Sequence, residues 1–234
     1  MPEEAREKIM SLISEIESVE EVVVESRPEF ISKDSVKRCL EALKGKELEV
    51  ALGLESSDDF VVNVLVNKNS SYQEFLRAVK EAKEAGALVK AYILLKPPFM
   101  SEKDSIEDAV KTTVNAVKAG VNSISYNLCN VQRGSLVEVL WRNGYYRPPW
   151  LWSIIEVLKR TAKVRKGVRT LLGTAGWGTR RGAHNCGRCD ERVKEFLRKF
   201  VETQDETVLD NLSCKCMRKW EAILELENLT LITS

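Results

Sequence analysis

Apolar residues follow two alternating patterns along this chain. Within residues 9–19 they recur every three or four positions, which is the spacing of an amphipathic helix, and residues 22–24 are an uninterrupted run of valine, which is typical of a buried β-strand. A helical pattern followed by an apolar run recurs further along the chain, with strands expected at residues 48–54, 89–95 and 121–128. The pattern predicts a series of helix–strand units.

The same alternation continues in the next part of the chain. After a stretch rich in tryptophan, tyrosine and proline, residues 150–161 have a helical pattern and residues 168–172 form a further apolar run, before a glycine-rich loop at residues 173–182. Strands that alternate with helices build a parallel sheet, either open or closed into a barrel, with functional side chains at the carboxyl ends of the strands. We therefore expect an α/β fold with five parallel strands.

The first expected strand, residues 22–24, is continuously apolar, as expected of a strand with a neighbour on each side. An uncovered edge strand of this kind is prone to pair with other chains. We therefore expect either that another segment covers this edge or that a preceding segment is missing.

The composition changes this picture little. The chain has 234 residues, with 44% apolar and 30% charged residues, which suits a globular protein with one core. The longest apolar runs are far shorter than the roughly 18 residues that a membrane span requires, and the first residues do not resemble a signal peptide. We expect a cytoplasmic protein with no membrane association.

Four of the six cysteines form two close pairs, Cys186 with Cys189 and Cys214 with Cys216. In the absence of a secretory segment, such pairs favour a metal site over disulfides. Two pairs brought together supply the four thiolates that structural zinc prefers, although an iron–sulfur cluster also uses four cysteines. We predict a zinc site, with His184 as a less favoured alternative to one thiolate.

Positive charge is concentrated in one part of the chain. Residues 141–199 contain 15 Lys and Arg against 4 Asp and Glu, a net charge of +11, whereas residues 1–140 contain 18 against 24 and residues 200–234 contain 3 against 7. The basic stretch also holds five aromatic residues, namely Trp141, Tyr145, Tyr146, Trp150 and Trp152. This combination is typical of an RNA site, through phosphate contacts and base stacking. The alternative is that the aromatic residues are buried and the arginines only solvate a face.

Several strand ends carry recognisable motifs: ESRPEFI at residues 25–31, GLES at residues 53–56 and YILLKPP at residues 92–98. Together they resemble the later half of the radical S-adenosylmethionine (SAM) barrel of the Elongator-like group. The motifs NVQRGSLVE at residues 130–138 and YRPPWLW at residues 146–152 are similar, more narrowly, to the archaeal radical SAM proteins that act in archaeosine synthesis on transfer RNA. The resemblance covers nearly the whole chain.

The resemblance implies a partial (β/α) barrel over residues 1–175 and a small cysteine-rich metal module over residues 176–234. The family holds its [4Fe–4S] cluster on a CxxxCxxC loop after the first barrel strand, and this sequence contains no such spacing. We therefore expect the chain to begin just before the fourth strand of the barrel. Three strands and the cluster would then come from another polypeptide, or the chain is a truncated product. Alone, it should not perform the family's reaction, hydrogen abstraction by a 5′-deoxyadenosyl radical.

In the family, the ends of the fourth and fifth strands contact SAM. These ends correspond here to Glu25 with Arg27 and to Gly53 with Glu55 and Ser56. Carboxylates can accept hydrogen bonds from the ribose hydroxyls or the methionine ammonium, and an arginine can bind the methionine carboxylate. The alternative is that the Glu and the Arg at the first of these strand ends pair with each other. SAM and the cluster are expected only when the missing half is present.

A second set of polar residues is expected where a substrate would face SAM. These residues are Lys96, Asn127, Asn130, Gln132 and Arg133. Amide side chains at such positions could read the edge of a modified base. Roles in turns and helix caps are the alternative.

We interpret the sequence as the C-terminal part of a radical SAM enzyme that modifies transfer RNA. Its expected partners are transfer RNA and an N-terminal cluster-bearing half, another protein on the open edge, or a second copy of the chain. Two alternatives stay open. One is a non-catalytic RNA-binding scaffold with a structural zinc, and the other is an unrelated, complete α/β enzyme that uses Glu25 and Glu55 as acid and base.

Overall fold

The strands of the sheet follow the order of the chain. The computed structural model describes the backbone of residues 2–230 and the side chains of residues 2–227. Within these residues one parallel sheet has five strands, in the order β1 (Glu21–Ser26), β2 (Glu47–Glu55), β3 (Leu88–Leu95), β4 (Ser123–Leu128) and β5 (Arg169–Gly173). The α/β fold class and the parallel strands are confirmed.

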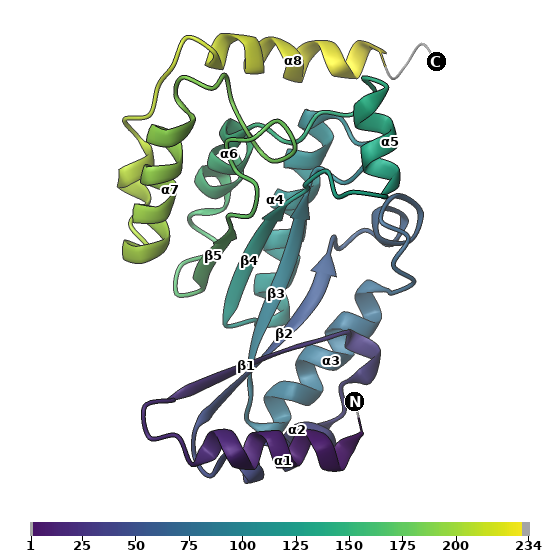
Figure 1. The fold of residues 1–234 in the computed structure, drawn as a ribbon, viewed down its shortest axis with the longest axis vertical. Helices are drawn as coiled ribbons and strands as arrows, with labels where there is room; N and C mark the ends of the chain where they lie inside the picture. The colour runs from purple at the N-terminus through teal and green to yellow at the C-terminus, as the bar shows by residue number, and fades with distance from the viewer. Residues whose placement is uncertain (1, 231–234) are drawn as a thin grey trace.

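Helices connect the strands and continue beyond them. They are α1 (Glu3–Ser14), α2 (Lys33–Leu43), α3 (Tyr72–Ala85), α4 (Glu102–Ala119), α5 (Leu136–Arg142), α6 (Leu151–Thr161), α7 (Asp190–Thr203) and α8 (Met217–Thr230), with short helical turns at Pro28–Phe30, Val61–Leu65 and Glu206–Leu209. α8 crosses the molecule at the end where β3 and β4 terminate (Figure 1). Within the described part of the chain, no helix is long and apolar enough to cross a membrane.

Local sequence signals set the ends of the connecting helices. Ser71 Oγ accepts a hydrogen bond from the backbone N–H of Glu74, whose carboxylate accepts one from the backbone N–H of Ser71, so the two residues form a capping box at the start of α3. Gly86 and Gly120 end α3 and α4 with φ of 104° and 88°, in the left-handed region that glycine adopts without strain. These boundaries are encoded by nearby residues.

The two faces of the sheet differ in polarity. In β2, Leu48 and Val50 pack with helix residues in the hydrophobic core. On the opposite face, Glu49 forms a buried ion pair with Lys90 of β3 and accepts a hydrogen bond from Ser123 of β4, at 2.5 Å. Because alternate residues of a strand point to opposite faces, helices cover one face and polar side chains gather on the other.

The sheet is strongly curved. A guanidinium nitrogen of Arg169, at the start of β5, lies 3.8 Å from a carboxylate oxygen of Glu21, at the start of β1, although these strands are the two edges of the sheet. A single pair of side chains can join the two edges only if the sheet curls toward a barrel. The partial (β/α) barrel implied by the resemblance is therefore present.

The edge at β1 is uncovered within the described residues. β1 pairs with β2 alone, and the side chain of Val23 is 45% exposed. Of the two expectations for this edge, cover by another segment is not met within the described residues, and a missing preceding segment stays a prediction. Ile9 of α1, which lines the same hollow as Val23, is exposed as well, so apolar surface borders this edge.

One side chain covers the opposite edge. The amide of Gln204 accepts a hydrogen bond from the backbone N–H of Thr170, at 2.8 Å, and donates one to the backbone carbonyl of the same residue, at 2.9 Å. The amide thus takes the place of a neighbouring strand at β5.

The C-terminal helices pack on the barrel. Phe200 of α7 and Trp220 of α8 belong to the same hydrophobic core as Trp152 of α6, and Trp220 Nε1 donates a hydrogen bond to Ser153 Oγ at 2.9 Å. Helices α5, α7 and α8 were not predicted from the sequence, although Val193, Leu197 and Phe200 of α7 follow helical spacing. A separate module over residues 176–234 stays a prediction.

Candidate metal centre and cofactor pocket

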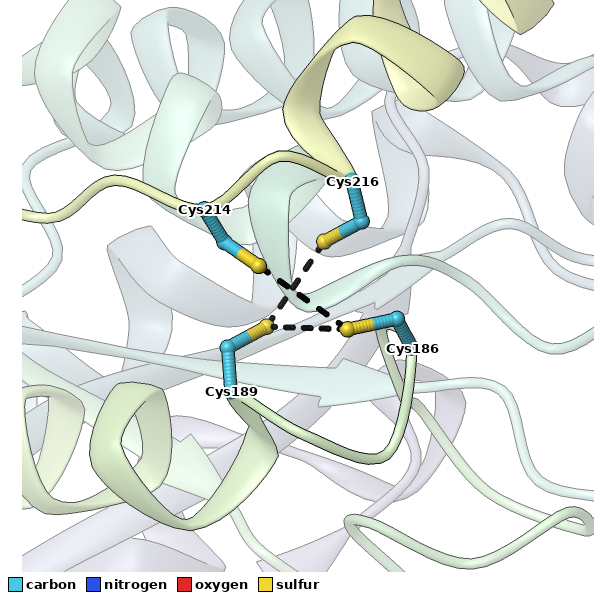
Figure 2. Close-up of side chains that lie close together, drawn as sticks. All are labelled: Cys186, Cys189, Cys214 and Cys216. Atoms are coloured by element: carbon cyan, nitrogen blue, oxygen red, sulfur yellow. Dashed lines mark hydrogen bonds between the residues drawn. The ribbon is translucent and has the colours of Figure 1, made fainter.

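The two cysteine pairs come together in space. Cys186 and Cys189 lie in the loop before α7, and Cys214 and Cys216 lie in the segment before α8, with side chains that point toward one another (Figure 2). The sulfur–sulfur distances are 3.7 Å within the first pair, and 3.9 Å and 3.6 Å between the pairs. All four sulfurs lie within 4.8 Å of one another.

This geometry fits one tetrahedral ion. Four sulfurs at about 2.3 Å from a central ion are separated from one another by about 3.8 Å, close to the three distances between 3.6 and 3.9 Å given above. In a [4Fe–4S] cluster each cysteine binds a different iron atom, so the sulfurs are farther apart. The predicted metal group is therefore present as four cysteines. His184 lies outside it, and its ring Nδ1 is 2.8 Å from the carbonyl of Gly182.

Asp190, the first residue of α7, holds the loop that carries the first cysteine pair. Its carboxylate accepts hydrogen bonds from the backbone N–H groups of Asn185 and Gly187, each at 2.7 Å. Gly187 has φ of 84°, in the left-handed region, so the tight turn between Cys186 and Cys189 depends on this glycine.

The thiols of the metal group differ in acidity. Burial raises the pKa of the Cys186 thiol, but the backbone N–H groups of Arg188 and Cys189 offset this and lower the pKa to about 7. Burial raises the pKa of Cys189 to about 11 and also raises the pKa of Cys216. Because a metal ion binds thiolates, its binding displaces protons from these sulfurs.

Two side chains donate hydrogen bonds to the sulfurs. Trp152 Nε1 of α6 lies 3.3 Å from Cys216 Sγ, and Asn185 Nδ2 lies 3.6 Å from Cys189 Sγ. Such donors stabilise charge on metal-bound thiolates and orient them. Through Trp152, the metal group is also attached to the barrel.

Arg147 connects the metal group to the barrel interior. Its guanidinium donates to the backbone carbonyls of His184 and Asn185, at 2.7 and 3.2 Å, and stacks on Trp150, 3.9 Å from the ring centroid. The backbone N–H of Trp150 donates in turn to Glu102, at 2.8 Å. Burial lowers the pKa of Arg147, whereas the nearby acidic groups, Glu102 first among them, act in the opposite direction. A partly buried positive charge therefore lies against the loop that carries the first cysteine pair.

Three aromatic residues of the basic stretch, Tyr146, Trp150 and Trp152, are buried. Buried rings cannot stack on bases, so the predicted RNA contact is wrong for these three residues. Tyr145 is 82% exposed, and Trp141 is half-buried. Only these two of the five aromatic side chains reach the surface.

Lys96 does not face solvent. Its ammonium pairs with Glu102, and its backbone carbonyl accepts a hydrogen bond from the hydroxyl of Tyr146, at 2.8 Å. The predicted contact of Lys96 with a substrate stays a prediction, and it would require this ion pair to open.

The other predicted substrate residues lie near the ends of β4 and β5. Asn127 of β4 lies beside Gly173 of β5. A β-carbon added at position 173 would come within 2.3 Å of the Asn127 amide oxygen. Asn130 donates a hydrogen bond to a backbone carbonyl of the glycine-rich loop, at 2.9 Å, which matches the alternative of a loop-stabilising role. Gln132 and Arg133 are exposed.

A hollow of about 1040 Å³ lies beside β1, β2 and β3. Its lining includes four of the five predicted SAM contacts, namely Glu25, Arg27, Gly53 and Glu55. The structure thus brings together residues of two strand ends, as the parallel sheet predicts.

Ser56, the fifth of these residues, lies apart from the pocket lining. It is buried and donates a hydrogen bond to Asp108 of α4, at 2.6 Å. Burial raises the pKa of Asp108 to about 6, against the effect of this hydrogen bond. A contact of Ser56 with SAM stays a prediction.

Glu25 and Arg27 have separate partners. The hydroxyl of Tyr92 donates to Glu25 at 2.8 Å, whereas Arg27 pairs with Glu29 at 2.6 Å. The alternative in which Glu25 and Arg27 pair with each other is therefore wrong. Burial, together with Glu25, raises the pKa of Tyr92 to about 12, so its hydroxyl stays a donor at neutral pH.

Lys68 also lines the pocket, and the sequence patterns do not single it out. Its Nζ donates to the backbone carbonyl of Gly53 at 2.6 Å and pairs with Glu55 at 2.7 Å. A β-carbon at position 53 would come within 2.2 Å of this nitrogen. The glycine of the GLES motif thus leaves space for the Lys68 ammonium. A glycine at this strand end was the sequence feature that indicated a close approach by another group.

The chain is therefore a curved parallel half-barrel with a charged pocket at its strand ends and a four-cysteine metal group. No family model matches it. Among solved structures, Elp3 from the archaeon Methanocaldococcus infernus is 19% identical and matches 82% of this chain and 45% of its own, with a TM-score of 0.62. Coproporphyrinogen III oxidase (HemN) from Escherichia coli, a radical SAM enzyme, is 14% identical and matches 71% of this chain and 37% of its own, with a TM-score of 0.50. The fold is thus that of part of a radical SAM barrel.

Curated relatives give the narrower assignment. Archaeosine synthase subunit beta from Methanosarcina acetivorans is 41% identical over 227 residues, which are 97% of this chain and 65% of the relative. The subunit of the same name from Thermococcus kodakarensis is 40% identical over 223 residues, which are 95% of this chain and 68% of the relative. The chain therefore belongs to the family of archaeosine synthase subunit beta, and the resemblance stated from its motifs is confirmed. It spans about two thirds of the length of these relatives.

Proposed function

We propose that this chain binds SAM in the pocket beside β1 to β3 and forms the C-terminal part of a radical SAM subunit that modifies transfer RNA in archaeosine synthesis. The position of the pocket carries the proposal. Its lining combines the ends of β1 and β2 with the uncovered edge of the sheet, so a bound cofactor would face whatever completes the barrel.

The free groups of the pocket suit SAM. Arg27 uses Nε and Nη2 for its contacts with Glu29 and with two backbone carbonyls, which leaves Nη1 for the methionine carboxylate. Glu25 uses one carboxylate oxygen for Tyr92, which leaves the other for a ribose hydroxyl or the methionine ammonium. Both assignments agree with those that the family resemblance implies.

We further propose that a cluster-bearing segment outside this sequence completes the barrel at β1. An eight-stranded barrel has an interior just wide enough for side chains to fill, and its first and fifth strands face each other. Arg169 of β5 and Glu21 of β1 contact each other from the fifth and the first strand of this sheet, as such an arrangement predicts. An eight-stranded barrel would then lack three strands between β5 and β1, which is the number of strands that the resemblance places before β1.

A structural zinc is the metal that we propose for the four cysteines. Zinc accepts a closed tetrahedral shell of thiolates, with no position left open for chemistry. The metal group shares no residue with the pocket lining. Its role in this proposal is to hold the segments before α7 and α8 together on the barrel.

Formation of 5′-deoxyadenosine from SAM tests the proposed function. The chain is mixed with a polypeptide that carries the CxxxCxxC loop, reconstituted with iron and sulfide, and reduced. We expect product from the mixture but not from either polypeptide alone. Arg27→Ala should abolish it, whereas Arg160→Ala, which changes an exposed arginine of α6 outside the pocket, should not.

Other outcomes separate the alternatives. Product from the chain alone would contradict the need for a second segment. RNA binding without restored SAM cleavage by any cluster-bearing partner would favour the non-catalytic scaffold.

A further inference from the structure

Two loops join beside the carboxyl ends of β4 and β5. In the first loop, residues 130–145, which includes the short helix α5, the backbone N–H of Val131 donates to the carbonyl of Arg181 at 2.7 Å, and Arg181 Nε donates back to the carbonyl of Val131 at 3.1 Å. The second loop, residues 174–189, continues into the metal group. The two loops therefore form one surface that runs from α5 to the cysteines.

This surface is strongly basic. The two loops contain one acidic residue, Glu138, and five arginines, which we call the arginine strip: Arg133, Arg142, Arg180, Arg181 and Arg188. The side chains of Arg133, Arg180 and Arg188 are exposed and have no ion pair or hydrogen bond with the described residues. The charges of these three arginines are thus not paired within the described residues.

Glu138 fixes the other two arginines in place. Its carboxylate accepts hydrogen bonds from Arg181 at 2.8 Å and from Arg142 at 3.1 Å, and from the backbone N–H of Gly134 at 2.8 Å. Gly134 and Arg181 lower the pKa of Glu138 to about 2, so it stays charged. One carboxylate offsets only one of the five guanidinium charges.

The same surface exposes an aromatic ring. Tyr145 is 82% exposed, whereas the next residue, Tyr146, is buried and donates a hydrogen bond from its hydroxyl to the backbone carbonyl of Lys96. The guanidinium of Arg181 lies 5.1 Å from the ring centroid of Trp141, which is four residues before Tyr145 in the sequence. Exposed aromatic rings among guanidinium groups are the combination that stacks on unpaired bases and binds phosphates.

We propose that the arginine strip and Tyr145 form the surface on which RNA docks, with the exposed arginines on phosphates and Tyr145 stacked on an unpaired base. The proposal rests on the proposed function for the identity of the RNA as a transfer RNA. An acidic protein would also satisfy the arginines, but it would leave the exposed ring without a planar partner.

Fluorescence anisotropy with an unmodified transfer-RNA transcript, at several salt concentrations, tests this surface on the zinc-loaded chain. Tyr145→Ala should weaken binding about tenfold and leave the salt dependence unchanged, whereas Tyr145→Phe should bind normally. The double variant Arg133→Ala/Arg180→Ala should weaken binding and reduce the slope of log K against log[salt] by about 0.7 to 0.9 for each lost phosphate contact.

The matched control is Lys163→Ala/Lys166→Ala. It removes the same charge at exposed positions before β5, at the opposite end of that strand, and should change neither affinity nor slope. Melting temperatures should be equal for all variants, so that a loss of binding is not a loss of fold.

Three results would overturn the proposal. They are an equal loss in the control variant, no binding even at low salt, and binding of polyglutamate as tight as that of RNA with no effect of Tyr145→Ala. The assay contains neither SAM nor a cluster-bearing partner, so the docking surface can fail while SAM cleavage succeeds, and the reverse.

Discussion

The ammonium of Lys96 lies 2.6 Å from a carboxylate oxygen of Glu102, and neither side chain is more than 4% exposed. The other oxygen of Glu102 accepts hydrogen bonds from the backbone N–H of Trp150 and from Ser153 Oγ, at 2.8 and 2.5 Å. This carboxylate therefore joins the end of β3 to α6 and to the loop that leads, through Arg147, to the metal group.

Lys96→Met should destabilise the protein strongly. The substitution leaves Glu102 buried without its positive partner, which should lower the free energy of unfolding by about 3 to 5 kcal/mol in urea unfolding. Lys103→Met, at an exposed neighbouring position of α4, should change it by less than about 0.5 kcal/mol. Equal stabilities for the two variants would show that Lys96 is available to a ligand rather than bound to Glu102.

Asp108 should make stability depend on pH between about 4 and 6. Burial raises its pKa from the ordinary value of 3.8 to about 6, although the hydrogen bond from Ser56 lowers it. Below pH 4 the carboxyl is protonated in both the folded and the unfolded state. As pH rises from about 4 to 6 the unfolded state loses its proton first, so stability falls, and above pH 6 the loss is complete.

Asp108→Asn should remove this pH dependence and keep an acceptor for Ser56. The free energy of unfolding of Asp108→Asn, relative to that of the unsubstituted protein, should therefore increase from pH 4 to 6. Above pH 6 this difference should level off at no more than about 3 kcal/mol. Chemical denaturation at a series of pH values measures it. Asp34→Asn, at an exposed position of α2, is the control, and a similar rise for this variant would contradict the assignment to Asp108.

Metal analysis should find one zinc per chain. The sulfur geometry suits a single ion, so Cys216→Ser should release it, whereas Cys39→Ala, at a buried cysteine outside the metal group, should retain it. Iron with acid-labile sulfide in the reconstituted chain would contradict the zinc assignment.

Removal of the metal should act locally at first. Hydrogen exchange should rise in residues 184–189 and 212–217, because the cysteines hold these segments together, while β2 and β3 stay protected by their strand pairing. Uniform loss of protection across the sheet would show that the metal controls global folding instead.

A charge on the open edge should block assembly. Val23 is 45% exposed on β1, so Val23→Lys should weaken copurification with a cluster-bearing partner at least tenfold without lowering the melting temperature. Val139→Lys, at a similarly exposed valine of α5, is the matched control. Equal effects of the two substitutions would argue against assembly at β1.

Much of the fold was predictable because its signals are local. The runs expected at residues 48–54 and 89–95 became β2 and β3 with boundaries within one residue, and glycines ended the helices before β3 and β4. Helices α5, α7 and α8 were missed: α5 has only seven residues and α8 has a weak periodic pattern, whereas α7 was overlooked although Val193, Leu197 and Phe200 follow helical spacing. Their positions depend on packing against the barrel.

The sequence by itself determined the helix–strand order, the two strand ends that meet in the pocket, and the two cysteine pairs, since each follows from spacing along the chain. The tertiary structure decided which side chains are available. It turned Ser56 toward Asp108, buried Lys96 on Glu102, and brought Lys68 into the pocket. It also brought together cysteines 28 positions apart in the chain, so that the two pairs form one group. Burial and distances of this kind depend on segments that are remote in sequence, so spacing along the chain could not supply them.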